Sequence, residues 1–239
     1  MTSYHGGKQR IGKKLAQIIV EESIDISQDE GWKIKGYCEP FAGMLGVYQH
    51  IPELYEENNL KLKYQAGDIN KSVIMMWKES QKGWKPPTKC TKTQFMSLKN
   101  NGMSSPEKGF IGHICAFRSV YFQVYANHIT ESRLSNTSNK VSQIGTDLKK
   151  VTFKDGNYMQ FSSLKNHVIY CDPPYEDTRQ EYYNDNNKKH IFNSSEFWEW
   201  CRRMSKHNIV FVSSYSAPKD FEQIWSSGLE KLYLNMRDL

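Results

Sequence analysis

Two spacings of apolar residues alternate in the N-terminal third of this chain. Residues 12–23 (GKKLAQIIVEES) carry apolar side chains at helical spacing and predict a helix. Residues 33–46 predict a short strand that ends in a loop with two glycines, and the VYQHI that follows predicts the start of a helix. Residues 60–70 predict a second strand, and the KSVIMMWKES after it predicts another helix. This order predicts a βαβα unit.

The same alternation returns near Val151 and continues toward the C-terminus. HVIYC (167–171) and NIVFVSSY (208–215) predict strands, and residues 194–207 between them predict a helix with Ser194 or Ser195 as its cap. Alternating strands and helices favour an α/β fold with a mostly parallel sheet covered on both faces. Ligands of such sheets bind at the carboxyl ends of the strands, where the strand order reverses.

The middle of the chain has a different pattern. Pro86 and Pro87 mark the exit from the first unit. Residues 106–126 predict one long helix with Ser105 as its cap and Pro106 in its first turn. Residues 134–146 are polar and predict a flexible loop.

Length and composition limit the class of protein. With 239 residues the chain is long enough for one α/β core with an insertion. No apolar run approaches the roughly 20 residues that a bilayer span needs, and the start of the chain lacks the apolar core of a signal peptide. The five cysteines form no C-x-x-C pair and predict reduced thiols rather than a metal site. We expect a soluble, cytoplasmic protein without metal.

The positive charge is concentrated in the middle of the chain. The net charge is +6, and residues 82–154 hold twelve Lys and Arg against three acidic residues, so the rest of the chain is slightly acidic. Clustered Lys and Arg are typical of a surface that binds phosphates. The charge excess alone is equally compatible with a solvated face.

Small and acidic residues follow the first two predicted strands. Residues 39–43 (EPFAG) and Gly46 form a glycine-containing turn where backbone can approach a ligand closely. Asp68 follows 25 residues after Gly43, at the tip of the next strand, where it can accept hydrogen bonds from ribose hydroxyls. The spacing is neither G-x-G-x-x-G nor a phosphate loop, and it indicates a nucleoside site.

Four motifs in order resemble one known family. YHGGK (4–8), EPFAG (39–43), GDIN (67–70) and YCDPPY (170–175) resemble the adenine-specific DNA methyltransferases of the Dam-like family, and the match extends from Tyr4 to about Ser214. The resemblance implies a Rossmann-like, S-adenosylmethionine-dependent methyltransferase sheet made of residues 1–81 and 149–239. It implies an inserted, mainly helical target-recognition domain at 82–148, and another pair of strands after Ser214.

The resemblance also implies how the cofactor is bound. Lys8 would face the carboxylate of S-adenosylmethionine, the Phe41 loop its methionine part, Asp68 its ribose and Tyr158 its adenine. The implied set is Tyr4, Gly7, Lys8, Glu39, Pro40, Phe41, Ala42, Gly43, Asp68, Ile69, Tyr158 and Asp172.

The D-P-P-Y stretch predicts the chemistry of transfer. The lone pair of adenine's exocyclic amine is delocalised into the ring, so that an enzyme must localise it and aim it at the methyl group. Asp172 and the carbonyl of Pro173 can accept its two N–H bonds, and Pro173 and Pro174 fix the backbone between them. Tyr175 is expected to stack on the base, which must be flipped out of the duplex.

Double-stranded DNA is therefore the expected partner. The residues expected to contact it are Arg118, Arg133, Asn136, Asn139, Lys140 and Lys149. The resemblance also implies a bacterial, phage or viral source, a short palindromic target such as GATC and, in some members, a companion restriction endonuclease. The sequence leaves two alternatives open: the same chemistry on RNA adenine or on cytosine N4, and a catalytically silent DNA-binding module.

Overall fold

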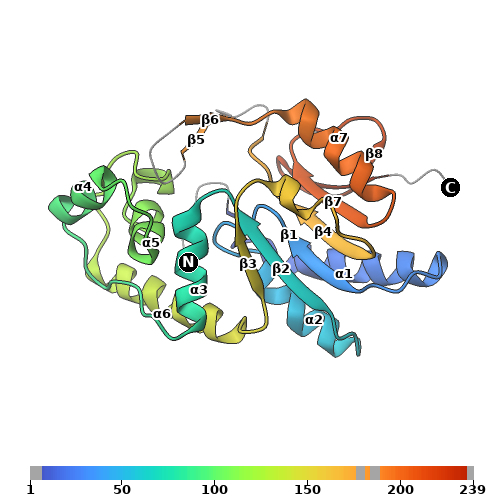
Figure 1. The fold of residues 1–239 in the computed structure, drawn as a ribbon, viewed down its shortest axis with the longest axis horizontal. Coiled ribbons are helices and arrows are strands. Elements are labelled where there is room, and N and C mark those ends of the chain that lie inside the picture. Colours follow the sequence, from blue (N-terminus) through green and yellow to red (C-terminus); the bar gives the residue numbers. More distant parts are fainter. Residues whose placement is uncertain (1–6, 176–180, 184–188, 236–239) are drawn as a thin grey trace.

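A computed structural model describes residues 7–175, 181–183 and 189–235, with 181–183 and 189–191 described as backbone only. Its centre is a seven-stranded sheet of order β3-β2-β1-β4-β7-β9-β8 (Figure 1). β5 (Glu181–Tyr183) and β6 (Lys189–Ile191) form a separate antiparallel pair. The strands of the large sheet are β1 (Gly36–Glu39), β2 (Lys63–Asp68), β3 (Thr152–Asp155), β4 (His167–Cys171), β7 (Ile209–Ser214), β8 (Phe221–Ser227) and β9 (Glu230–Asn235).

Most of this sheet is parallel, as the alternating sequence pattern predicts. β3, β2, β1, β4 and β7 run in one direction, whereas β9 is antiparallel to β7 and β8 is antiparallel to β9. β8 and β9 are the strand pair expected after Ser214. The strand order reverses between β1 and β4, because the chain first builds outward to β2 and β3 and later returns to the other side of β1. The crevice at the carboxyl ends of β1 and β4 is therefore where a ligand is expected.

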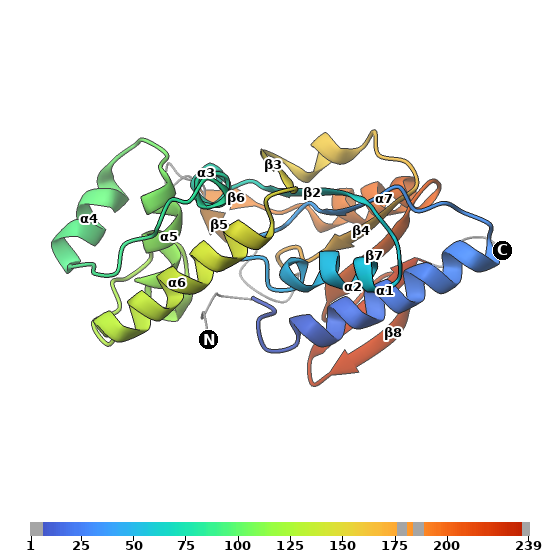
Figure 2. The same cartoon turned by 90° about the horizontal axis from the view of Figure 1, so that it is seen from below.

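Helices cover both faces of the sheet (Figure 2). α1 (Gly12–Asp29) and α2 (Ile51–Glu57) lie on one face and α7 (Ser194–Ser205) on the other. Alternate residues of a strand point to opposite faces, so Val168 and Tyr170 join the core beneath α1, whereas Ile169 and Cys171 join the core beneath α7. The cap of α7 is Asn193, whose side chain accepts from the backbone of Glu196, and not Ser194 or Ser195.

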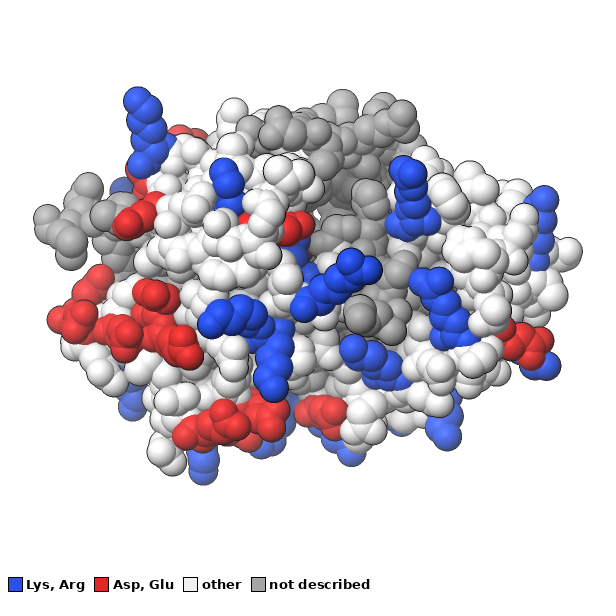
Figure 3. Space-filling model, turned by 180° about the vertical axis from the view of Figure 1, so that it is seen from behind, with Lys and Arg blue, Asp and Glu red and all other residues white. Residues whose placement is uncertain are grey.

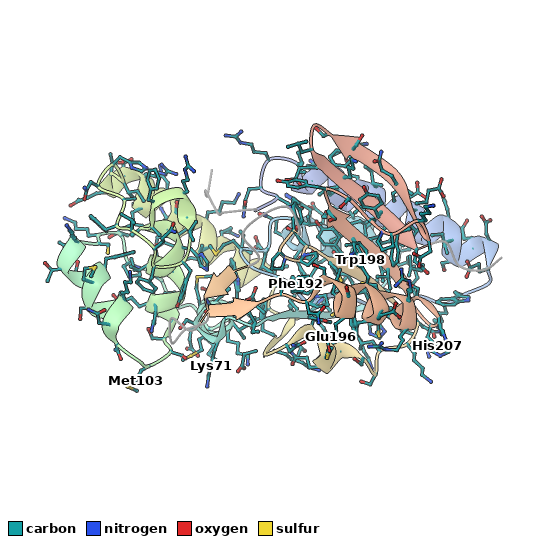
Figure 4. The ribbon with its side chains drawn as sticks, turned by 90° about the horizontal axis from the view of Figure 1, so that it is seen from above. Lys71, Met103, Phe192, Glu196, Trp198 and His207 are labelled. Atoms are coloured by element: carbon teal, nitrogen blue, oxygen red, sulfur yellow. The ribbon has the colours of Figure 1, made fainter. Side chains whose placement is uncertain are left out.

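The two tryptophans of α7 belong to the core. Trp198 is 7% exposed and its ring lies 4.9 Å from that of Phe221, and Figure 4 shows it on the sheet side of the molecule with Phe192. Trp200 is fully buried, and its indole N–H donates to Ser162 Oγ at 2.9 Å. Trp198 therefore packs α7 against β8, and Trp200 connects α7 to the segment that contains Ser162.

A group of helices extends from the edge of the sheet between β2 and β3 (Figure 1). α3 (Lys71–Gln81) is followed by α4 (Lys92–Asn100), α5 (Pro106–Ile114) and α6 (Glu131–Asp147). α5 and α6 approach α3 most closely at Gly109 and Gly145, where a Cβ would collide with Ser72 and Ser80. Because glycine has no side chain, α5 and α6 can pack closely against α3 at these two positions.

Two expectations for this part of the chain are wrong. Residues 134–146 are not a loop but most of α6, which begins at the cap Thr130 and buries Leu134, Val141 and Ile144 at helical spacing. The polar composition was misleading because Thr137 and Thr146 donate to carbonyls four residues earlier in the same helix.

The long helix expected at 106–126 is also wrong, because α5 ends at Ile114. Ser105 caps it as expected, by accepting from the backbone of Lys108. After it the chain forms a hairpin, here called the 116–125 hairpin, in which Phe117 N donates to Val124 O at 2.7 Å. This hairpin contains the short 3-10 helix η2 (Phe117–Ser119), and Arg118, Ser119 and Phe122 have positive φ angles of 52°, 57° and 47°. A right-handed α-helix cannot continue through residues at positive φ.

Candidate active site

The Asp68 end of the crevice is formed by the loops after β1 and β2. Asp68 accepts hydrogen bonds from the backbone N–H of Gly43 at 2.9 Å and of Asn70 at 2.8 Å. Gly43 has a positive φ of 45°, and its carbonyl accepts from the buried Trp77 indole at 2.9 Å. Because these donors belong to tight turns, the carboxylate of Asp68 is held in a fixed orientation.

Aromatic rings form one wall beside that carboxylate. The rings of Phe41 and Tyr158 lie 5.3 Å apart at 30°, and both contact Phe197 of α7. Tyr158 begins the short 3-10 helix η3 (Tyr158–Phe161), which Asn157 caps by accepting from Met159 N at 2.9 Å. The wall offers a flat apolar surface of the kind that adenine rings bind.

The Asp172 end lies directly after β4. Asp172 Oδ1 accepts from Lys8 Nζ at 2.8 Å and from Tyr175 OH at 3.0 Å. Lys8 is only 4% exposed, and the ring of Tyr175 packs edge-on against Tyr215 at 4.5 Å. A Cβ at Gly46 would lie 3.1 Å from the backbone of Lys8, so this glycine lets the N-terminal segment approach the glycine loop.

Glu230, at the start of β9, completes this end of the crevice. Its Oε2 lies 2.9 Å from Tyr175 OH and 3.3 Å from Lys8 Nζ. The sequence motifs gave no sign of it. Because β9 is antiparallel to the central strands, its first residue lies at the carboxyl edge of the sheet, beside the end of β7.

Burial and neighbouring charges oppose one another in this cluster. Burial lowers the pKa of Lys8, but the carboxylates of Asp172 and Glu230 outweigh it and raise that pKa overall, so Lys8 stays charged. Burial raises the pKa of Asp172, Glu230 raises it further, and Lys8 opposes both. Burial also raises the pKa of Glu39 well above its usual range, which favours the neutral carboxyl at the end of β1.

A cavity of about 840 Å³ connects the two ends. It is lined by every predicted cofactor and catalytic residue within the described part of the chain; Tyr4 lies outside that part. These lining residues are Gly7, Lys8, Glu39, Pro40, Phe41, Ala42, Gly43, Asp68, Ile69, Tyr158, Asp172, Pro173, Pro174 and Tyr175. The structure thus brings together residues that lie far apart in the sequence, from Gly7 to Tyr175.

The cavity also has lining residues that the motifs did not indicate. One is Gln9, whose buried Nε2 has no hydrogen-bond partner among the described residues. Others come from the 116–125 hairpin; they include Phe117, Ser119, Val120 and Tyr121. Their only signal in the sequence was the aromatic density of the segment that was expected to be helical.

The predicted DNA-contacting residues divide into two groups. Arg118 lines the cavity from the hairpin. The other group is exposed on or just after α6 and lies outside the cavity lining; it consists of Arg133, Asn136, Asn139, Lys140 and Lys149. The pKa of His50 is lowered first by burial and then by the positive charges of Lys140 on α6 and Lys13 on α1, so each of these lysines lies within electrostatic range of His50.

Basic side chains also gather around the centre of one face. Figure 3 shows Lys and Arg around the centre of this face, while most acidic side chains of that view lie toward the sheet side. Within the described residues no cluster of His, Cys, Asp and Glu suits a metal ion, and the five cysteines are free thiols. No helix among the described residues is long and apolar enough to cross a membrane.

The fold and the crevice define an α/β protein with a cavity at the carboxyl ends of β1, β2 and β4, which is where sheets of this kind bind their ligands. The family model of the D12 class N6 adenine-specific DNA methyltransferases matches residues 114–236, just over half of the chain. The chain belongs to this family, which confirms the resemblance carried by the four motifs. A search of curated proteins finds no match to this chain.

Proposed function

We propose that the protein transfers the methyl group of S-adenosylmethionine to N6 of an adenine that has been flipped out of duplex DNA. Membership of the D12 class supports the DNA adenine specificity. The observation that carries the proposal is the position of Asp172 and Tyr175 at one end of a single cavity whose other end holds Asp68. A cofactor and a base can therefore meet within one cavity.

The residues at the Asp68 end fit this cofactor. A carboxylate held by two backbone amides suits a ribose diol, and the Phe41–Tyr158 wall suits an adenine ring. The buried, unpartnered Nε2 of Gln9 is a donor that a ligand acceptor such as a carboxylate would satisfy. When bound, S-adenosylmethionine supplies a methyl group activated by a positively charged sulfur.

Asp172 and Pro173 hold the amino group that receives the methyl. The carboxylate accepts one N–H and the Pro173 carbonyl accepts the other, which draws the nitrogen toward tetrahedral geometry and localises its lone pair. Pro173 and Pro174 fix the backbone angles between these acceptors, so they do not relax away from the amine. No strong general base is required, because the methylated product loses its extra proton readily.

The 82–148 segment binds the duplex on either side of the flipped base. Flipping costs about a few kcal/mol, which contacts to the base and to neighbouring phosphates offset. Support for a target-recognition role comes from the basic residues exposed along α6 and from Arg118 at the cavity. The remaining predicted cofactor contact, Tyr4, precedes the described residues and stays a prediction.

Incubation with labelled S-adenosylmethionine tests this proposal. We expect label in unmethylated duplex DNA, and nucleoside analysis should identify the product as N6-methyladenine. Label that appears only in RNA, or as N4-methylcytosine, would overturn the substrate assignment. Tight binding of duplex DNA without any transfer would instead show a catalytically silent module.

A further inference from the structure

The cluster at the Asp172 end contains two carboxylates that share the same two donors. Lys8 Nζ lies 2.8 Å from Asp172 Oδ1 and 3.3 Å from Glu230 Oε2. Tyr175 OH lies 3.0 Å from Asp172 Oδ1 and 2.9 Å from Glu230 Oε2. Neither donor therefore belongs to Asp172 alone.

The hydrogen-bonding capacity of this cluster makes the two carboxylates competitors. A phenol has one hydrogen, so Tyr175 can donate fully to only one of Asp172 and Glu230 at a time. A carboxylate oxygen has about two acceptor sites, and both sites of Asp172 Oδ1 are filled when Lys8 and Tyr175 turn to it, so that the amino group has only Oδ2 to bind. Any donor that Glu230 draws away leaves an acceptor site open on Asp172.

We propose that Glu230 is a positioning residue for methyl transfer, which draws Lys8 and Tyr175 away from Asp172 so that Asp172 can accept the amino group of the target base. This inference rests on the proposed function, because it assumes that Asp172 binds that amino group. Glu230 touches neither base nor cofactor in this role. It keeps Lys8 and Tyr175 paired when the substrate takes their place on Asp172.

The burial of the donors explains why a second acceptor is needed. Lys8 is 4% exposed, and a buried ammonium is stabilised when a second carboxylate lies within reach as the first turns to another donor. With Glu230 already 3.3 Å away, Lys8 changes partner by a small movement. Glu230 has a side chain 32% exposed, so its own charge costs little when Asp172 is occupied.

The test compares Glu230→Gln with the wild-type protein in single-turnover transfer to unmethylated duplex DNA. The amide keeps an acceptor oxygen for Tyr175 but removes the charge that attracts Lys8. We expect the transfer rate to fall by about ten- to a hundredfold, with cofactor and duplex affinities within about twofold of wild type. Glu222→Gln, which alters an exposed glutamate of the same β8–β9 hairpin, is the matched control and should leave the rate unchanged.

The pH profile separates positioning from a merely structural role. The charged and titratable groups that face Asp172 are Lys8, Glu39, Tyr170, Tyr175 and Glu230. Glu230 is the negative neighbour that raises the pKa of Asp172, so removing its charge should move the acid limb of the transfer rate to lower pH. Glu230→Asp, which keeps the charge but shortens the side chain, should keep the limb and recover part of the rate.

The outcomes distinguish this inference from the proposed function. No transfer by the wild-type protein would count against the proposed function itself. If the wild type is active and the Glu230→Gln variant has the same transfer rate and the same acid limb, the role of Glu230 is overturned, while the proposed function stands. A slow variant whose cofactor affinity and melting temperature fall together, with the acid limb in place, would also overturn it. If Glu230→Gln does not fold, Glu230→Asp decides the same question, because its rate should still fall below that of Glu222→Gln.

Discussion

The two ends of the cavity hold their aspartates in different ways. Asp68 accepts from two backbone N–H groups, at 2.9 Å from Gly43 and 2.8 Å from Asn70. Asp172 accepts from two side chains, at 2.8 Å from Lys8 and 3.0 Å from Tyr175. Backbone donors are fixed by the turns that they belong to, whereas side-chain donors exchange partners by rotating about their bonds.

Under the proposed function, this difference distinguishes the end that binds the cofactor from the end where the methyl group is transferred. A fixed carboxylate suits a cofactor that binds in the same orientation in every cycle. An acceptor with exchangeable partners suits an amino group that arrives, reacts and leaves. Variants that act differently at the two ends therefore test whether the division is real.

The largest effect is expected at the Asp172 end. Asp172→Ala should reduce methyl transfer by about a thousandfold, because the amino group loses the acceptor that localises its lone pair. The fold should survive, since Lys8 still has Glu230 at 3.3 Å and no buried charge is left unpaired. Single-turnover assays with labelled cofactor measure the rate, and fluorescence anisotropy should show unchanged duplex affinity. Near-normal activity would remove Asp172 from the mechanism.

A smaller effect, on binding rather than on turnover, is expected at the Asp68 end. Asp68→Ala should weaken cofactor binding by about ten- to a hundredfold and lower the free energy of unfolding by about 1–3 kcal/mol, because Gly43 and Asn70 lose their acceptor. At saturating cofactor the transfer rate should approach that of wild type. Calorimetric titration and denaturant unfolding measure the two quantities.

The neighbouring strand supplies a matched control for Asp68. Asp155 on β3 is in register with Asp68, but its side chain is 43% exposed and it lies outside the cavity lining. Asp155→Ala should leave cofactor affinity unchanged and alter the free energy of unfolding by less than about 0.5 kcal/mol. Equal losses in both variants would mean that charge at this edge of the sheet, and not the geometry of Asp68, holds the ligand.

The carboxyl ends of the parallel strands could be predicted from sequence because their residue types are dictated locally. Gly43 is needed for a positive φ, Asp68 lies at the end of a predicted strand, and Asp172 directly follows a buried apolar strand. The parallel topology then brings their ends to one edge, so the sequence alone places them in one crevice.

The rest of the site depends on tertiary contacts, which cannot be predicted from the local sequence pattern. Thr137 and Thr146 of α6 donate within the helix, whereas the buried Ser138 and Gly145 meet Pro86 and Ser80, which lie outside it. The 116–125 hairpin holds non-glycine residues at positive φ, which local propensity argues against. Glu230 reaches the cavity only because an antiparallel strand reverses the direction of the chain at the end of the sheet.

Glu39 sharpens the comparison because it lies on β1, between the strands that carry the two aspartates. It accepts from Tyr37 OH at 2.7 Å, and burial raises its pKa well above the ordinary value of 4.5. If its carboxyl is neutral at working pH, Glu39→Gln should change the transfer rate and the cofactor affinity by less than about threefold, since the amide keeps the acceptor oxygen. A large loss in this variant would show that an ionised Glu39 takes part in binding.

The stability of the Glu39→Gln variant should depend on pH in a defined direction. A carboxyl whose pKa is raised by folding binds its proton more tightly in the folded state, so its stabilising contribution is complete at low pH and is lost as the pH rises above about 4.5 toward the raised pKa. The glutamine cannot titrate and does not show this loss. Denaturant unfolding of both proteins should therefore show that the free energy of unfolding of the variant rises relative to that of the wild type as the pH increases from 4.5. A difference that stays constant with pH would mean that Glu39 has the same pKa in the folded and unfolded states, and that the centre of the sheet edge does tolerate a charge between Asp68 and Asp172.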